Sequence, residues 1–143
     1  MPKKKKASKR YLVFISHSAK DRWTAQRMAD RIEQQGRKYQ IKTFLDERDI
    51  EGGESIPETI KNNIRKSNEF LVLISRNSKD RAWVQIEIGA AWILGKRMIA
   101  IIDNISPKEM PDVIVLRKAI DLNDFENYVN QLLRRASKIG GRT

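Results

Sequence analysis

The sequence predicts a single α/β domain built on a doubly wound, parallel sheet of five strands. Short apolar runs alternate along the chain with segments of helical periodicity, and each of the first three runs ends in a polar loop. Strands that alternate with helices are joined by right-handed crossovers, which make the strands parallel and place helices on both faces. At 143 residues, 40% of them hydrophobic, the chain can bury one sizeable core.

The first half of the chain contains two predicted strands, each followed by a predicted helix. YLVFIS at 11–16 is too short for a helix and predicts a buried strand. A helical spacing of apolar residues covers 21–36 and closes on a glycine. QIKTFLD at 40–46 alternates as a second strand, and 56–67 places three isoleucines at i, i+4 and i+8 of a helix.

The second half repeats this order and ends on a helix. EFLVLIS at 69–75 predicts a third buried strand, and an apolar helix follows over 80–94. The segment 104–117 shows no clear pattern of a helix or a strand. The remaining predicted elements are a strand at 97–103, a short strand at 118–122 and an amphipathic helix at 123–136.

The formal charge of +11 is concentrated at the two ends of the chain. Residues 1–10 carry six basic side chains and residues 134–143 carry four, with no acidic residue in either segment. Residues 11–133 hold 19 Lys or Arg against 18 Asp or Glu. We therefore expect a nearly neutral domain over 11–136, a disordered basic tail before it and a basic tail over 137–143. Such tails are usually solvated, and they suggest contact with nucleic acid or a membrane only weakly.

Composition and loop motifs argue against several classes of function. With no cysteine and with His17 as the only histidine, we expect no disulfide, no thiolate nucleophile and no metal site. No apolar run approaches the roughly 18 to 20 residues of a membrane span, and MPKKKKASKR is no secretory signal, so we expect a soluble cytoplasmic protein. The loops SHSAKD, DERDIEGGES and SRNSKDRAW meet at the ligand-binding edge of such a sheet. None is a dinucleotide fingerprint or a P-loop, so hydride and phosphoryl transfer lose their main support.

A carboxylate stands inside the apolar helix WVQIEIGAAWILG. At about 100° per residue, Glu87 projects far from Gln85 and falls between Trp83 and the apolar residues at i+3, i+4 and i+7. Glu87 is therefore outside the solvated stripe. Such a carboxylate either bonds a backbone amide or a basic side chain such as Arg81, or lines a cleft in which desolvation raises its pKa. The pattern leaves both interpretations open.

Three stretches together resemble a known family. YLVFISHSAKD, FLDERDIEGGESIPETIKNNIRKS and FLVLISRNSKDRAWVQIE resemble, in order and spacing, the first motif, the loop-bearing second motif and the W-x-x-x-E helix of TIR (Toll/interleukin-1 receptor) domains. The resemblance covers residues 11 to about 103 and is strongest to prokaryotic-type members. It implies a flavodoxin-like sheet. For members that keep the glutamate, it implies cleavage of NAD⁺, as substrate and not as cofactor, to nicotinamide plus ADP-ribose or a cyclised ADP-ribose.

This chemistry suits a site with one carboxylate. Ordinary glycosidases need a second carboxyl group to protonate a poor leaving group, whereas nicotinamide leaves a ribosyl pyridinium as a neutral molecule. The enzyme must stabilise an oxocarbenium-like centre and fix the ribose. An ionised Glu87 in a low-dielectric cleft could do both.

The resemblance also implies a set of site residues. They are Glu87 as the catalytic residue, with Ser16, His17, Ser18, Ala19, Arg48 and Trp83 as substrate-binding positions. Many enzymatic members place an arginine near Ser18 or Ala19, and this chain has none there. Arg48 lies in the second-motif loop, where members contact the ligand. Trp83 could wall the nicotinamide pocket or simply belong to the core.

Partners and rival functions follow from the same resemblance. We expect homotypic assembly through the second-motif loop and a role in antiviral defence or cell-death signalling. We also expect a nucleotide-sensing effector or a trigger protein as a partner, or a need for high concentration. A non-catalytic TIR scaffold that binds through the loop at 46–55 is one alternative. The other is an enzyme like nucleoside deoxyribosyltransferase, because EIGAAWILGKRMIAII also resembles the segment that carries the nucleophilic glutamate there.

Overall fold

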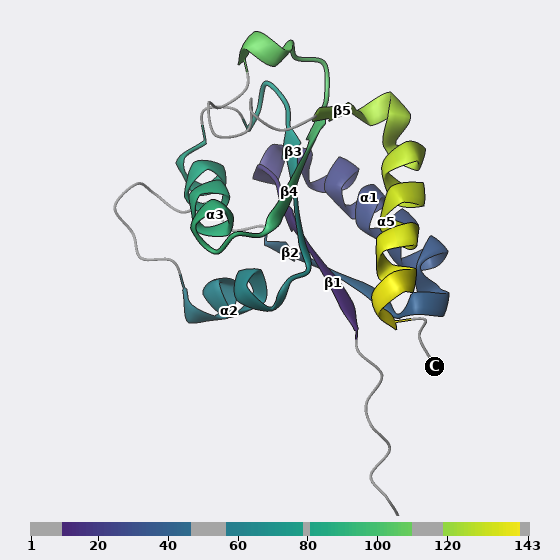
Figure 1. Ribbon diagram of the computed structural model, residues 1–143. Helices are drawn as coiled ribbons and strands as arrows, with labels where there is room; N and C mark the ends of the chain where they lie inside the picture. Colours follow the sequence, from purple (N-terminus) through teal and green to yellow (C-terminus); the bar gives the residue numbers. More distant parts are fainter. Residues whose placement is uncertain (1–9, 47–56, 79–80, 110–118, 141–143) are drawn as a thin grey trace, which may run out of the picture.

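A computed structural model describes residues 10–46, 57–78, 81–109 and 119–140 (Figure 1). The five strands are β1 Tyr11–Ser16, β2 Ile41–Asp46, β3 Glu69–Ile74, β4 Arg97–Ile102 and β5 Ala119–Asp121. The helices are α1 Arg22–Gln35, α2 Glu58–Lys66, α3 Ala82–Ile93 and α5 Phe125–Gly140. Short 3-10 turns span Ala19–Asp21, Arg37–Tyr39, Pro107–Glu109 and Leu122–Asp124.

The strands form one parallel sheet in the order β2-β1-β3-β4-β5, which confirms the predicted five-stranded α/β fold. Figure 1 shows α1 and α5 on one face of the sheet and α2 and α3 on the other. β1 pairs with β2 on one side and with β3 on the other. The chain therefore reverses its direction of travel across the sheet between β1 and β3, which is where open α/β sheets bind ligands.

Alternating side chains of β3 supply both halves of the core. Leu71 and Leu73 belong to the apolar cluster beneath α1 and α5, whereas Phe70 belongs to the cluster beneath α2 and α3. Every side chain of β3 is buried, because a central parallel strand is covered on both faces. The ring of Phe70 stacks on Phe14 of β1 with centroids 5.5 Å apart.

The observed boundaries differ from the predicted ones mainly at chain reversals. Gln40 adopts a left-handed conformation, φ 55°, and closes the turn before β2, so the strand begins one residue later than predicted. Helix α5 continues to Gly140, beyond the predicted end at residue 136. The expected tail at 137–143 thus begins with residues that continue the helix. No helix in the described ranges is long and apolar enough to cross a bilayer.

Candidate active site

Glu87 occupies the middle of the buried stripe of α3. The helix buries the side chains at positions 83, 84, 87, 88 and 91, which repeat at the spacing of one helical face. Glu87 is 0% exposed, whereas Gln85 is exposed. The structure thus confirms that the two residues lie on different faces, as the helical projection predicts.

The Glu87 carboxylate reaches the carboxyl end of β1. The Ser16 hydroxyl, itself fully buried, donates a 2.6 Å hydrogen bond to Glu87 Oε1. The Arg81 Nε, which the sequence offered as a salt-bridge partner for Glu87, donates instead to the Asn77 carbonyl oxygen at 3.2 Å. Since β1 is one of the two strands at the reversal of strand order, this places the carboxylate at the expected ligand-binding edge.

In His17, the next residue after β1, the neighbouring backbone sets the hydrogen-bonding role of each ring nitrogen. Its side chain is 1% exposed, and Nδ1 lies 2.8 Å from the Ser18 carbonyl oxygen. A carbonyl oxygen only accepts hydrogen bonds, so Nδ1 carries the proton and Nε2 is the acceptor in the neutral ring. Nε2 is buried and has no hydrogen-bond partner among the described residues. His17 can therefore accept a hydrogen bond from a bound hydroxyl or amino group.

A buried network joins the loops after β1 and β3. Asp21 is 6% exposed and accepts hydrogen bonds from Ser18, from Ser75 at 2.6 Å and from Asn77 at 2.9 Å. Ser78 extends the network by accepting from the Ser75 backbone amide. Ser18 is predicted from the sequence as a binding residue, whereas Asp21, Ser75, Asn77 and Ser78 are not, although their position at the ends of two strands that flank the reversal is a usable signal. The network fixes the loops on both sides of the candidate site.

The other predicted binding residues do not lie together in one site. Trp83 is 3% exposed and belongs to the apolar cluster under α2 and α3, so its indole contributes to the core. Ala19 is half-buried and lies beside Arg22 and Trp23, with which it lines a shallow depression of about 520 Å³. Arg48 is outside the described residues, and its role stays a prediction.

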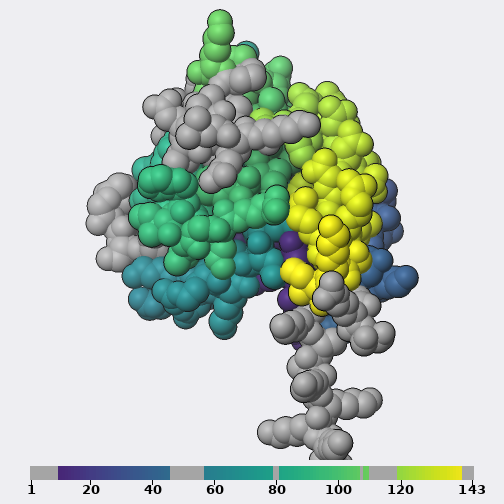
Figure 2. Space-filling view, in the orientation of Figure 1, coloured from purple at the N-terminus to yellow at the C-terminus, as the bar shows by residue number. Residues whose placement is uncertain are grey.

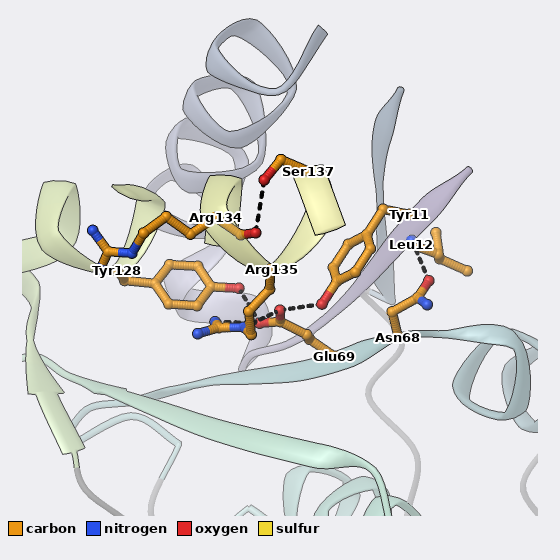
Figure 3. Close-up of polar contacts among 8 residues, drawn as sticks. All are labelled: Tyr11, Leu12, Asn68, Glu69, Tyr128, Arg134, Arg135 and Ser137. Carbon is orange, nitrogen blue, oxygen red and sulfur yellow. Dashed lines mark hydrogen bonds and ion pairs between the residues drawn. The ribbon is translucent and has the colours of Figure 1, made fainter. Parts of the chain in front are cut away.

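A second buried carboxylate, Glu69, lies at the opposite edge of the sheet, where β3 begins. Figure 3 shows it between Tyr11 of β1 and the α5 residues Tyr128 and Arg135. Arg135 donates to its two oxygens at 2.6 and 2.8 Å, and both phenol hydroxyls also donate to them. Burial and the neighbouring carboxylate raise the pKa of Tyr11 and Tyr128. The hydrogen bonds to Glu69 raise the pKa of Arg135.

The edge with Glu87 brings together groups that suit a cationic, hydroxyl-rich substrate. The carboxylate supplies negative charge in an apolar setting, where electrostatic stabilisation is strongest. Ser16 orients the carboxylate, and His17 Nε2 offers an acceptor on the neighbouring loop. The arrangement can therefore stabilise positive charge and hold hydroxyl groups.

Comparison with known proteins agrees with this fold. The family model described as "TIR domain" matches residues 13–133. A curated relative, the NAD(+) hydrolase TcpC of Escherichia coli O6:H1 strain CFT073, is 32% identical over 79 residues. The match covers 54% of this chain but 24% of TcpC, so the chain spans about a quarter of that relative's length.

Two solved structures share the fold over most of the chain. A TIR-STING receptor from C. gigas, in complex with 2′,3′-cGAMP, is 21% identical with a TM-score of 0.67, covering 92% of this chain and 41% of that one. The TIR domain of the Toll-related receptor TRR-2 from Hydra magnipapillata is 25% identical with a TM-score of 0.62, covering 86% and 94%.

Proposed function

The chain belongs to the TIR domain family, and we propose that it cleaves the nicotinamide–ribose bond of NAD⁺ with Glu87 as the catalytic carboxylate. One observation carries the proposal: Glu87 is fully buried on the inward face of α3 and accepts a hydrogen bond from Ser16 at the reversal of strand order. The similarity to a protein named as an NAD(+) hydrolase supports the same substrate.

The reaction needs stabilised positive charge more than proton transfer. The bond between the ribose anomeric carbon and the pyridinium nitrogen breaks, and its electron pair leaves with neutral nicotinamide. The ionised Glu87 carboxylate faces the oxocarbenium-like centre that develops on the ribose. A water molecule then attacks the anomeric carbon and releases a proton, which gives ADP-ribose. Attack by an atom of the substrate's own adenosine gives a cyclic ADP-ribose instead.

The neighbouring residues would bind and orient the substrate. Glu87 and His17 Nε2 both accept hydrogen bonds, so they suit the ribose hydroxyls. Arg22 lines the depression beside Ala19 and could supply the phosphate contact that the 16–19 segment lacks. Arg48 remains the candidate from the second-motif loop.

Burial of Glu87 supports the proposal that the domain is inactive when alone. A carboxylate that is 0% exposed must become accessible before it can contact a ribose. We propose that homotypic assembly, promoted by a trigger protein or by high concentration, opens the site. This control suits signalling by a nucleotide product, or NAD⁺ depletion in antiviral defence or cell death.

The decisive test is product analysis with purified protein. The protein, dilute and crowded, is incubated with NAD⁺, and the products are resolved by mass spectrometry, which separates ADP-ribose from its cyclic form by one water. We expect nicotinamide release that rises with crowding and is abolished by Glu87→Gln. Glu58→Gln makes the same chemical change on an exposed carboxylate of α2 and should retain activity. Intact NAD⁺ in every condition, or an active Glu87→Gln variant, would overturn the proposal.

A further inference from the structure

Three consecutive large apolar side chains are exposed where α3 ends. Trp92 is 55% exposed, Ile93 79% and Leu94 42%, although most of the helix packs against the sheet. Single exposed apolar residues are ordinary, but a contiguous group of this size is typical of an interaction surface. Among the described residues, Trp23 and Ile139 are the other large apolar side chains with comparable exposure.

Basic side chains surround this group. Ile93 and Leu94 line a groove of about 200 Å³ between α2 and α3 together with Lys61 and Arg65. Directly after them, Lys96 and Arg97 line a second groove of about 520 Å³, which reaches Arg135 of α5. Figure 2 shows this hollow between the green surface of α3 and β4 and the yellow surface of α5. Among the described residues that line the two grooves there is no Asp or Glu.

Part of this positive charge has a structural role, and part does not. Lys96 donates to the carbonyl oxygens of Arg65 and Ser67 and so caps the end of α2. The charge of Arg135 is matched by Glu69. In contrast, Lys66 and Arg97 are exposed. Arg97 neither caps a helix nor packs into the core, and the exposed Trp92 does not pack into the core either.

The described chain also enters and leaves at this end of the molecule. Figure 1 shows β1 beginning and α5 ending at the same end, near α2. Residues 1–10, which lead into β1, carry six basic side chains, and residues 134–143, which include the last turns of α5, carry four, with no acidic residue in either range. Most of the net charge of the protein is therefore attached at this end.

We propose that the surface formed by the ends of α2, α3 and α5 with the start of β4 docks on an anionic lipid bilayer. Basic side chains near a negatively charged leaflet attract it, and Trp92 and Ile93 can enter the headgroup region, where an indole and aliphatic groups are favoured. A nucleic acid would satisfy the charges equally well but would leave the apolar side chains in water. The exposed apolar side chains therefore favour a bilayer over a nucleic acid as the partner.

The docked orientation leaves the candidate active site accessible. Glu87 and the loop network lie at the carboxyl edge of the sheet, whereas the docking surface lies toward the opposite edge. The inference rests on charge and exposure, so it does not depend on the proposed NAD⁺ cleavage.

The test is co-sedimentation of the full-length protein with phosphatidylcholine vesicles, with and without phosphatidylserine, at about 0.1 M and 0.5 M salt. We expect salt-sensitive binding to the anionic vesicles. Reversing two charges in Lys66→Glu/Arg97→Glu should weaken it by roughly 25-fold or more. Trp92→Ser/Ile93→Ser should weaken it by about 10-fold.

Matched variants at the opposite edge provide the control. Arg76→Glu/Lys108→Glu reverses two exposed charges in the same way, and Trp23→Ser removes an indole that is 74% exposed, against 55% for Trp92. Both variants should bind anionic vesicles as wild type does. Equal binding to neutral vesicles, no binding at all, or loss of binding in the controls to the same extent would overturn the proposal. It would also be overturned if Trp92→Ser/Ile93→Ser bound normally, and tight binding of a duplex oligonucleotide by that variant would then assign the surface to nucleic acid.

Discussion

Two carboxylates, Glu69 and Glu87, are both fully buried and lie at opposite edges of one sheet. Glu69 is held by a bidentate arginine and two phenol hydroxyls, so its charge is matched by a positive charge and its oxygens are surrounded by donors. Glu87 accepts from the neutral hydroxyl of Ser16. Glu69 lies where β3 begins, whereas Glu87 reaches the carboxyl end of β1, at the reversal of strand order where open α/β sheets bind ligands. The difference separates a structural charge from a candidate catalytic one.

The largest expected effect comes from breaking the Glu69 cluster. Arg135→Ala leaves a buried carboxylate without its counter-charge and should lower the free energy of unfolding by about 3–5 kcal/mol. Urea denaturation followed by circular dichroism measures this loss. Arg134→Ala, which removes the neighbouring exposed side chain, should change stability by no more than about 0.5 kcal/mol. A loss below about 1 kcal/mol for Arg135→Ala would show that the cluster is not the structural anchor described here.

Exchanging carboxylate for amide at each position sharpens the comparison. Glu87→Gln should reduce the rate of NAD⁺ cleavage about 100- to 1000-fold with little loss of stability, because the group acts on transition-state charge. Glu69→Gln should lower stability and leave the rate of NAD⁺ cleavage per folded molecule unchanged. It removes the counter-charge of Arg135 but does not touch the candidate active site. Paired measurements of turnover per folded molecule and of unfolding midpoint test both statements. Similar profiles for the two variants would remove the distinction.

A smaller effect is expected when the hydroxyl that orients Glu87 is removed. Ser16→Ala deletes the 2.6 Å donor to a fully buried carboxylate and should cost about 1.5–3 kcal/mol of stability, together with a loss of activity. Ser137→Ala is the matched control, because that exposed hydroxyl donates to a backbone carbonyl within α5. If both variants unfold at the wild-type denaturant concentration, the Ser16 contact contributes little.

The smallest effect appears only in alkali. Tyr11 and Tyr128 have raised pKa values in the folded state, chiefly because they are buried beside Glu69. Between the ordinary tyrosine pKa of about 10 and the folded value, the unfolded chain binds fewer protons than the folded one. Stability should therefore fall with rising pH by about 1.4 kcal/mol per unit for each tyrosine. The slope of unfolding free energy against pH above 10 should be shallower in Tyr128→Phe than in wild type, and equal slopes would contradict this.

The fold and the orientation of Glu87 follow from local pattern. Strand length, apolar alternation and crossover handedness predict the parallel sheet, and the helical period alone separates Glu87 from Gln85. Both properties depend on residues a few positions apart, which sequence periodicity records. The same pattern recovers β1 at its observed limits.

Contacts between residues that are far apart in the sequence cannot be predicted from this periodicity. The Ser16–Glu87 bond joins residues 71 positions apart, and it depends on how α3 settles against the end of β1. Glu69 stands at the start of a strand that the sequence predicts as buried, but its partner Arg135 lies 66 residues away on α5. The Asp21 network likewise forms only when β1 and β3 become neighbours.

The parallel sheet has a practical consequence for engineering. Because all five strands are parallel, the turns at their carboxyl ends lie along one edge of the sheet. The Glu69 cluster, which joins β1, β3 and α5, lies at the opposite edge. The turn after β1 could therefore be grafted from a relative with a different substrate without disturbing that cluster. Asp21 sets the limit of such a graft, since a donor loop must keep a carboxylate there to remain joined to the end of β3.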